Sequence, residues 1–246
     1  MYIQTPNILP PVVSTNTHLY IGRDQKQHTE TETVLTEHAL EVIVNGAISF
    51  SFVCLPEYLS ELVIGHLATE GILSSTQEIE QISFNESGTS AEIVLTHPLP
   101  ALPTALSSVT PISWKADWIF ALADRFADGM PLHSQTFATH SCFLAKEDQL
   151  LFECEDIGRH NALDKAIGFA LLHEISPSEC LLYSSGRMPA DMLCKALRAG
   201  IPIFASKGSP TSKAIELARQ YDITMLCAAR RDRMKQYAGA APLESF

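Results

Sequence analysis

Residues 180–229 have the sequence CLLYSSGRMPADMLCKALRAGIPIFASKGSPTSKAIELARQYDITMLCAA, which indicates the fold class more clearly than any other segment. Three short apolar segments, CLLYSS, IPIFAS and ITMLCAA, predict strands, and the sequences between them predict helices. Pro189 suits the first turn of one helix, Gly200 follows its end, and Ser209 is a candidate cap for the next. This alternation indicates right-handed βαβ crossovers, and therefore a largely parallel sheet covered on both faces.

The sequence before this stretch extends the same domain. TFATHSCFLA and QLLFECE predict two strands around the polar turn KED, which would give the sheet an antiparallel edge. Residues 159–174 predict a helix with one apolar stripe, and KADWIFALADRFADG predicts a helix that Gly129 ends. We therefore expect an α/β domain over residues 111–246.

A smaller α+β domain is expected over residues 1–110. Asn45-Gly46 lies between two alternating apolar segments and predicts a hairpin, because both turn residues need positive φ. A helix is predicted from Pro56 to Gly71, and EIEQISFN and SAEIVLT predict two more strands, which completes a ββαββ unit. Residues 1–37 are predicted to be irregular, and HPLPALPTALSSVTP a proline-rich linker.

Composition restricts the function classes. The formal net charge of −11 argues against nucleic acid as the main partner, and a hydrophobic content of 46% allows a sizeable core. No apolar segment is long enough to cross a bilayer, and the start of the chain lacks a secretory signal pattern, so a cytoplasmic protein is expected. The six cysteines include no Cys-x-x-C pair, and most are expected to be reduced and buried.

Three loops carry the candidate chemistry: EDIGRHN, SSGRMP and SKGSPTS. Each contains glycine and opens a helix, whose first N–H groups are unpaired and favour anions. The cations Arg159, His160, Arg187 and Lys207 lie at or beside these helix starts. Because ligands bind at the carboxyl ends of parallel strands, the pattern predicts a phosphate or pyrophosphate site.

A purely structural interpretation stays open for the same residues. Asp156 could only cap its helix, and the pairs His160–Asp164 and Asn161–Lys165 have the i,i+4 spacing of ordinary helix-surface contacts. His140, in a predicted strand, is either a satisfied core histidine or a side chain that faces the anion site.

EDIGRHNALDKAIG closely resembles the signature of the formate dehydrogenase accessory sulfurtransferase family (FdhD). The resemblance continues through SSGRMPADMLCKALRAGIPIFASKGSPTSKAIELARQYDITMLCAARRDRM, and EHALEVIVNGAISFSF and GHLATEGIL extend it to the first half of the chain. It implies a small α+β domain, followed by a cytidine-deaminase-like three-layer α/β/α domain, in a homodimer.

The resemblance also implies a function. Members of the family take sulfur from a cysteine desulfurase, bind the molybdenum bis-guanine-dinucleotide cofactor and help to sulfurate it before it enters formate dehydrogenase. The family's cofactor-binding run is similar to residues 227–232, and no catalytic or metal-binding residue is assigned. With the loop residues, the expected cofactor-binding set is His140, Arg159, His160, Asn161, Asp164, Lys165, Ser185, Gly186, Arg187, Cys227, Ala228, Ala229, Arg230, Arg231 and Asp232.

The sequence departs from the family at its sulfur-relay loop. Where the family has S-S-C-G-x-C-G, this chain has SSVTPIS, so Val109 and Ile112 replace the two cysteines. The family's T-G-G-x-H is TFATH here, with Phe137 and Ala138 in place of two glycines. Cys142 is a candidate substitute carrier, whereas Cys194 has the neighbours of a core residue.

Three functions follow as alternatives: a sulfurtransferase with a displaced cysteine, a cofactor-binding chaperone without sulfur chemistry, and a nucleotide hydrolase or deaminase on the same fold. The absence of the H-x-E and P-C-x-x-C signature disfavours the third.

Overall fold

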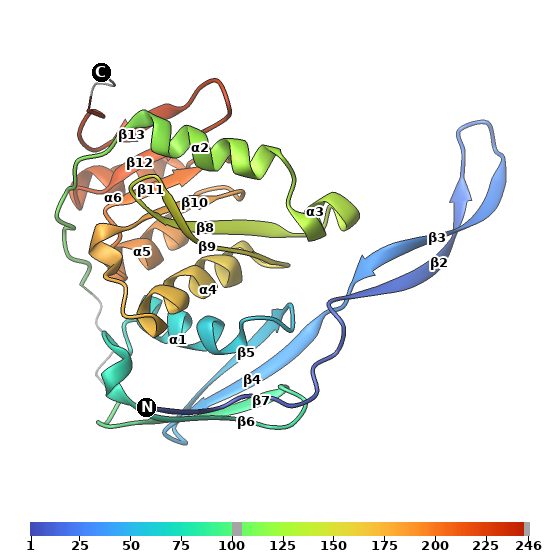
Figure 1. Cartoon of the computed structure of the whole chain (residues 1–246), viewed down its shortest axis with the longest axis horizontal. Helices are drawn as coiled ribbons and strands as arrows, with labels where there is room; N and C mark the ends of the chain where they lie inside the picture. Colours follow the sequence, from blue (N-terminus) through green and yellow to red (C-terminus); the bar gives the residue numbers. More distant parts are fainter. Residues whose placement is uncertain (100–104, 244–246) are drawn as a thin grey trace.

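The computed structural model describes residues 1–99 and 105–243 and contains two sheets packed through helices, with a long two-stranded arm projecting from the body (Figure 1). The larger sheet has six strands in the order β13-β12-β11-β10-β8-β9. β10, β11 and β12 are parallel, as predicted, and β8 and β9 form the predicted antiparallel edge. The strands are β8 (His140–Lys146), β9 (Gln149–Asp156), β10 (Leu181–Ser184), β11 (Ile203–Ser206), β12 (Thr224–Cys227) and β13 (Lys235–Ala238).

Helices cover both faces of this sheet. Successive residues of β10 belong to different hydrophobic clusters: Leu182 packs with α4 (Arg159–Leu172), α5 (Ala190–Arg198) and α6 (Ser212–Gln220), whereas Leu181 and Tyr183 pack with α2 (Ala116–Ala127). The predicted three layers are therefore present. α2 ends at Ala127, and the predicted stop, Gly129, follows its C-cap Asp128 with φ 106°.

The N-terminal unit is a five-stranded sheet in the order β1-β6-β7-β4-β5, with α1 (Leu59–Thr69) on one face. The predicted hairpin and the ββαββ order are present. The strands are β1 (Tyr2–Gln4), β4 (His38–Val44), β5 (Ile48–Cys54), β6 (Ile79–Phe84) and β7 (Ser90–Leu95), and a short 3₁₀ turn, η1 (Thr76–Glu78), precedes β6.

The two units share one hydrophobic core, because α1 packs directly on α4. Gly65 and Gly168 lie where these helices cross, and the helices approach so closely that neither position has room for a Cβ atom. The proposed boundary between residues 110 and 111 stays a prediction. Part of the predicted proline-rich linker, residues 100–104, lies outside the described residues.

Several elements of the described residues were not predicted. Residues 1–37, expected to be irregular, contain β1 and the arm formed by β2 (Val13–Ile21) and β3 (Gln27–Leu35). Most arm residues are exposed, so no buried face produces an apolar alternation that would reveal the strands. α3 (Pro131–Thr136) and β13 are too short to give a periodic pattern, as is the 3₁₀ turn η2 (Pro177–Glu179).

Within the described parts of the chain, no helix has the length and apolar character needed to span a membrane.

Candidate functional site

The three predicted loops converge at one edge of the larger sheet. Backbone hydrogen bonds join two of the loops to each other and to the segment after β12: Lys207 N donates to Ser184 O (2.9 Å), and Ala228 N donates to Gly208 O (2.8 Å). Ser185 N donates to Ser141 O at 3.0 Å, which connects β8 to the same edge. The carboxyl ends of the parallel strands therefore form one continuous surface, as the sequence predicted.

Glycine permits this convergence. A Cβ atom on Gly208 would lie 2.7 Å from the Cα of Arg187, and a Cβ atom on Gly186 would lie 3.1 Å from the Cβ of Arg159. The first distance is too short for any side chain, so Gly208 allows the loops after β10 and β11 to touch.

A cavity of about 550 Å³ opens beside these loops, on the face covered by α2. We call it the edge cavity. Its wall combines aromatic rings with cations: Phe126, His133, Phe137, Tyr183, Lys207 and Arg230. The volume is within the range of small-molecule sites, and the lining is of the mixed apolar and polar kind that such sites have.

Two positive charges in this wall lack a carboxylate partner among residues 1–99 and 105–243. Lys207 Nζ lies 4.4 Å from the centre of the Phe126 ring, and Arg230 Nη1 donates to the carbonyl oxygens of Lys207 and Ala229. Burial lowers the pKa of Lys207 from its ordinary value, and the charge of Arg230 lowers it further. Two like charges in a half-buried wall favour binding of an anion, which would neutralise them.

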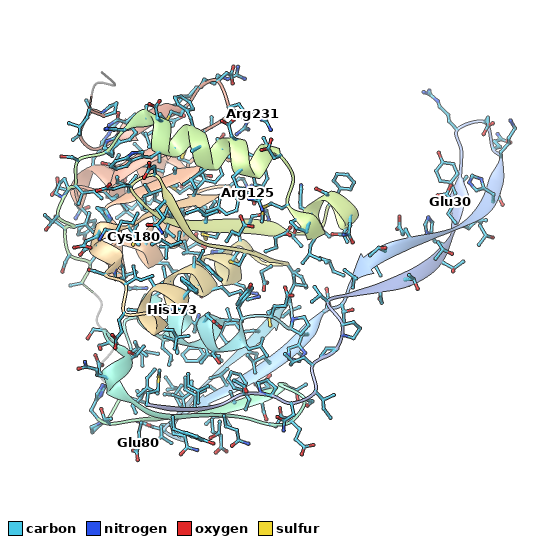
Figure 2. The ribbon with its side chains drawn as sticks, viewed as in Figure 1. Glu30, Glu80, Arg125, His173, Cys180 and Arg231 are labelled. Atoms are coloured by element: carbon cyan, nitrogen blue, oxygen red, sulfur yellow. The ribbon has the colours of Figure 1, made fainter. Side chains whose placement is uncertain are left out.

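The outer part of the cavity is already charge-balanced. Figure 2 shows Arg231 in the loop beside α2, where it pairs with Asp128 and, at 3.8 Å, with Asp124. Arg233 pairs with Asp232 at 3.1 Å. These exposed pairs contribute little energy, so Arg231 and Arg233 stay available to an incoming anion at low cost.

A second group of predicted residues lies on the same edge, around His140. His140 Nδ1 is 3.4 Å from Ser185 Oγ, and His160 Nε2 is 2.9 Å from Asp191 Oδ2. Burial lowers the pKa of His140, and the nearby charge of Arg159 lowers it further, which disfavours the imidazolium form. Arg187 is exposed.

Arg159 carries a buried Nε atom with no hydrogen-bond partner among the described residues. A buried donor without a partner is costly, so it indicates a group that a ligand or water satisfies.

Three of the predicted residues make contacts within the protein. Lys165 Nζ donates to Asp156 Oδ2 at 2.6 Å, and both side chains are fully buried. Asn161 donates to Asp156 and to the carbonyl oxygen of Val53, both at 2.8 Å.

Asp164 accepts hydrogen bonds from Lys195 (2.8 Å) and Thr69 (2.8 Å), and His66 Nδ1 lies 3.1 Å from it. Burial alone would raise the pKa of Asp164, but the His66 hydrogen bond and the Lys195 charge lower it overall. The contacts with His66 and Thr69 join α4 to the N-terminal unit. Several charged residues of the segment EDIGRHNALDKAIG therefore have a structural role. The ligand contacts predicted for Asn161, Asp164 and Lys165 stay predictions.

The cysteines offer no accessible thiolate. Cys142 and Cys227 are fully buried. Burial raises the pKa of the Cys142 thiol well above its ordinary value and that of Cys227 to about 12. Only Cys194 is partly exposed, and burial raises its pKa as well. Since a sulfur carrier needs an accessible thiolate, the burial of Cys142 disfavours its interpretation as a substitute carrier, which stays a prediction.

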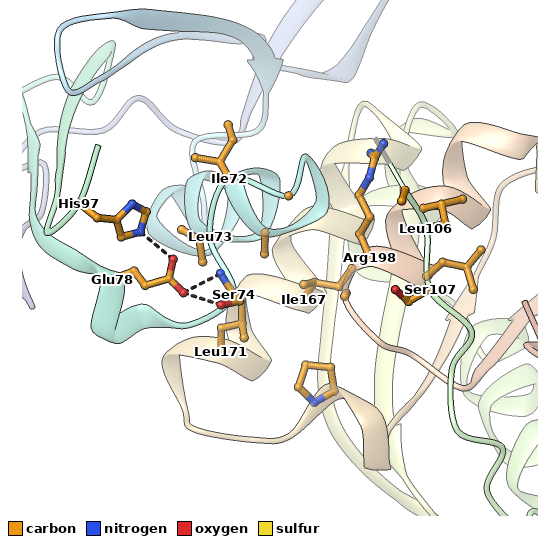
Figure 3. A pocket seen from close by; sticks show the side chains of 16 residues that line it. Ile72, Leu73, Ser74, Glu78, His97, Leu106, Ser107, Ile167, Leu171 and Arg198 are labelled. Atoms are coloured by element: carbon orange, nitrogen blue, oxygen red, sulfur yellow. Dashed lines mark hydrogen bonds and ion pairs between the residues drawn. The ribbon is translucent and has the colours of Figure 1, made fainter. Parts of the chain in front are cut away.

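The segment that replaces the relay loop lies at the opposite edge of the sheet. Val109 is buried, and its N–H donates to the carbonyl oxygen of Tyr221 (3.1 Å), just before β12 begins. Ser107 lines a separate cavity of about 450 Å³, shown in Figure 3, between the ends of α1, α4 and α5. Glu78 there is already bonded to His97 at 2.8 Å and to Ser74.

Sequence reasoning missed the aromatic half of the edge cavity. Phe126 and Tyr183 lie in a predicted helix and a predicted strand, and nothing in an apolar stripe distinguishes a cavity wall from a core residue. His133 and Phe137 lie in or beside the unpredicted α3. The only signal was the departure at Phe137, where the resembled family has glycine.

The geometry defines an α/β protein with a cationic, aromatic-lined cavity at the carboxyl edge of its parallel strands. The chain matches the model of the FdhD/NarQ family over residues 35–102 and 100–243 and belongs to that family, as its signature predicted. It is 32% identical to the sulfur carrier protein FdhD of Bacillus pumilus (strain SAFR-032) over 233 residues, 85% of this chain and 89% of that protein.

Two further comparisons agree. Identity to the sulfur carrier protein FdhD of Bacillus subtilis (strain 168) is 32% over 229 residues, 83% of this chain and 87% of that protein. A crystal structure of a candidate formate dehydrogenase accessory protein from Desulfotalea psychrophila superposes with a TM-score of 0.83 at 26% identity. The superposition covers 93% of this chain and 98% of the Desulfotalea psychrophila chain. The α/β fold is thereby confirmed; the finer likeness to cytidine deaminases stays a prediction.

Proposed function

We propose that this protein is an accessory factor for formate dehydrogenase that holds the molybdenum bis-guanine-dinucleotide cofactor at the edge cavity, without carrying sulfur on a thiol of its own. The observation that carries the binding part is the unneutralised pair Lys207 and Arg230 beside aromatic rings. The accessory role is supported by family membership and by the names of the relatives.

The residues present suit the guanine-nucleotide ends of such a cofactor. Lys207 and Arg230 would bind a diphosphate, with Arg230 able to present parallel N–H donors to its oxygens. Phe126 and Tyr183 contribute apolar surface to the wall of the same cavity. The molybdenum centre would supply the redox chemistry of the dehydrogenase. Among the described residues no cluster of histidines, cysteines and carboxylates could hold a metal ion, so recognition would rest on the nucleotide.

The chaperone alternative is favoured over the sulfurtransferase because none of the six thiols meets the needs of a relay. A persulfide forms by attack of a thiolate, and every cysteine has a raised pKa, among them Cys54 and Cys154 at about 12 and Cys180 at about 11. Partnership with a cysteine desulfurase and assembly as a homodimer stay predictions from the resemblance.

Isothermal titration with GDP tests the proposal. We expect GDP to bind the wild-type protein, and Arg230→Ala to weaken binding by about 1.5–3 kcal/mol, as for hydrogen bonds to charged groups. Arg187→Ala tests whether the cations around His140 contribute as well. The matched control is Arg23→Ala, because Arg23 is exposed in the turn of the β2–β3 arm. Equal GDP affinity of the wild-type and Arg230→Ala proteins would show that GDP does not bind in the edge cavity.

A further inference from the structure

Phe137 has a conformation and an exposure that folding does not explain. It ends α3 with φ 54° and ψ 18°, in the left-handed region, and its exposed fraction is 79%, the largest among the exposed large hydrophobic side chains of the described residues. For a bulky side chain the left-handed region is a genuine outlier, and glycine is the usual residue at such a helix end.

The local structure shows what holds this backbone in place. Phe137 N donates to His133 O at 2.8 Å, which closes the last turn of α3. Thr136 Oγ1 donates to Leu132 O at 2.8 Å, and Thr139 Oγ1 donates to the buried carboxylate of Glu155 at 2.7 Å. The turn is thus fixed from both sides, and any residue at position 137 must take a positive φ.

The ring of Phe137 stands at the rim of the edge cavity. It meets the His133 ring edge-on, with ring centres 5.9 Å apart, and lines the same cavity as Phe126, Tyr183 and Lys207. Two rings of that wall are already engaged, since Lys207 covers Phe126 and Phe143 stacks on Tyr183. Phe137 is the aromatic group of the wall whose faces are most open to a ligand.

We propose that Phe137 is a stacking residue that covers the planar base of a nucleotide whose phosphates bind Lys207 and Arg230. This inference rests on the proposed function and adds a base-stacking residue to it. An aromatic ring exposed at a cavity rim stabilises a base through its π-face, whichever base it is, and the stacked base removes apolar surface from water. The unfavourable backbone conformation is then retained because it aims the ring over the cavity.

Phe137→Gly tests this inference, because glycine suits the left-handed position and the variant should fold at least as well as the wild type. Titration calorimetry would compare GDP with inorganic pyrophosphate. We expect Phe137→Gly to bind GDP about 5- to 150-fold more weakly, the range for one base stacked on one ring, and to bind pyrophosphate as the wild type does. Phe137→Trp should retain the GDP affinity.

Tyr58→Gly is the matched control. Tyr58 is also an exposed aromatic residue with positive φ (54°), but it lies at the start of α1, packs on Phe152 and does not line the edge cavity. Its replacement should leave GDP affinity unchanged.

Three outcomes would count against the inference. Wild-type GDP affinity in Phe137→Gly would overturn the stacking role and leave the proposed function standing. An equal loss for GDP and pyrophosphate would show that Phe137 only shapes the phosphate site, which also overturns it. Absence of GDP binding by the wild-type protein would overturn the proposed function itself.

Discussion

The crossing of α1 and α4 gives a prediction whose sign opposes helix propensity. Gly65 and Gly168 lie in helix interiors, where replacing glycine by alanine ordinarily stabilises by about 1 kcal/mol. Here a Cβ atom on Gly65 would lie 2.6 Å from the carbonyl carbon of Asp164 and 2.8 Å from the amide nitrogen of Gly168. A Cβ atom on Gly168 would meet the backbone of Glu61 in the same way, at 2.6 Å.

The expected cost follows from these distances. Ordinary van der Waals contact begins at 3.4 Å, and the nearest atom to the added Cβ, the carbonyl oxygen of Asp164, lies closer still than its carbonyl carbon, so the two backbones must separate by more than an ångström at the contact point. Overpacking in a core typically costs about 1–3 kcal/mol, and more where backbone rather than a side chain must move. Since α1 belongs to the N-terminal unit and α4 packs on the larger sheet, separation also strains the hydrogen bonds that join Asp164 of α4 to Thr69 and His66 of α1. We expect Gly65→Ala to destabilise by at least about 2 kcal/mol.

Urea unfolding followed by circular dichroism measures this free energy. The control is Gly46→Ala, because Gly46 has φ 64° but open space around its Cβ position, so only the backbone cost of roughly 1 kcal/mol applies. A Gly65→Ala protein as stable as the wild type, or more stable, would refute the close helix crossing and with it the shared core of the two units.

Two further predictions concern the buried groups. Lys165→Met should reduce the free energy of unfolding by about 3–5 kcal/mol, because it leaves the fully buried Asp156 carboxylate without its cation; a change below about 1 kcal/mol in urea unfolding would contradict the structural role. After incubation with a cysteine desulfurase and cysteine, peptide mass spectrometry should find no added sulfur on any of the six cysteines. A persulfide on Cys194, the one partly exposed thiol, would restore the sulfurtransferase interpretation.

The sequence predicted those parts of the fold in which a residue pattern is compatible with only one local structure. The apolar strands of residues 180–229 alternate with helices, and only a parallel sheet with crossovers buries them all. Asn45-Gly46 predicted the hairpin between β4 and β5, because few residue pairs accept a positive φ angle at both turn positions. The β2–β3 arm escaped detection because it buries almost nothing.

The candidate site was predictable only in part. Glycines in the sequence located the loops, since Gly186 lies between β10 and α5 and Gly208 lies between β11 and α6. The direction of a charged side chain depends on what packs beside it. Lys165 and Asp164 therefore seemed equivalent to Arg159 in the sequence, although they face the N-terminal unit through contacts about 100 positions away in the chain, such as that of His66 with Asp164. No local pattern encodes such partners.

A crystal structure of this protein with GDP would locate the binding site directly. We expect GDP in the edge cavity, with its phosphates on Lys207 and Arg230 and its base against Phe137. GDP bound elsewhere, for example in the cavity lined by Ser107 and Arg198, would contradict this expectation.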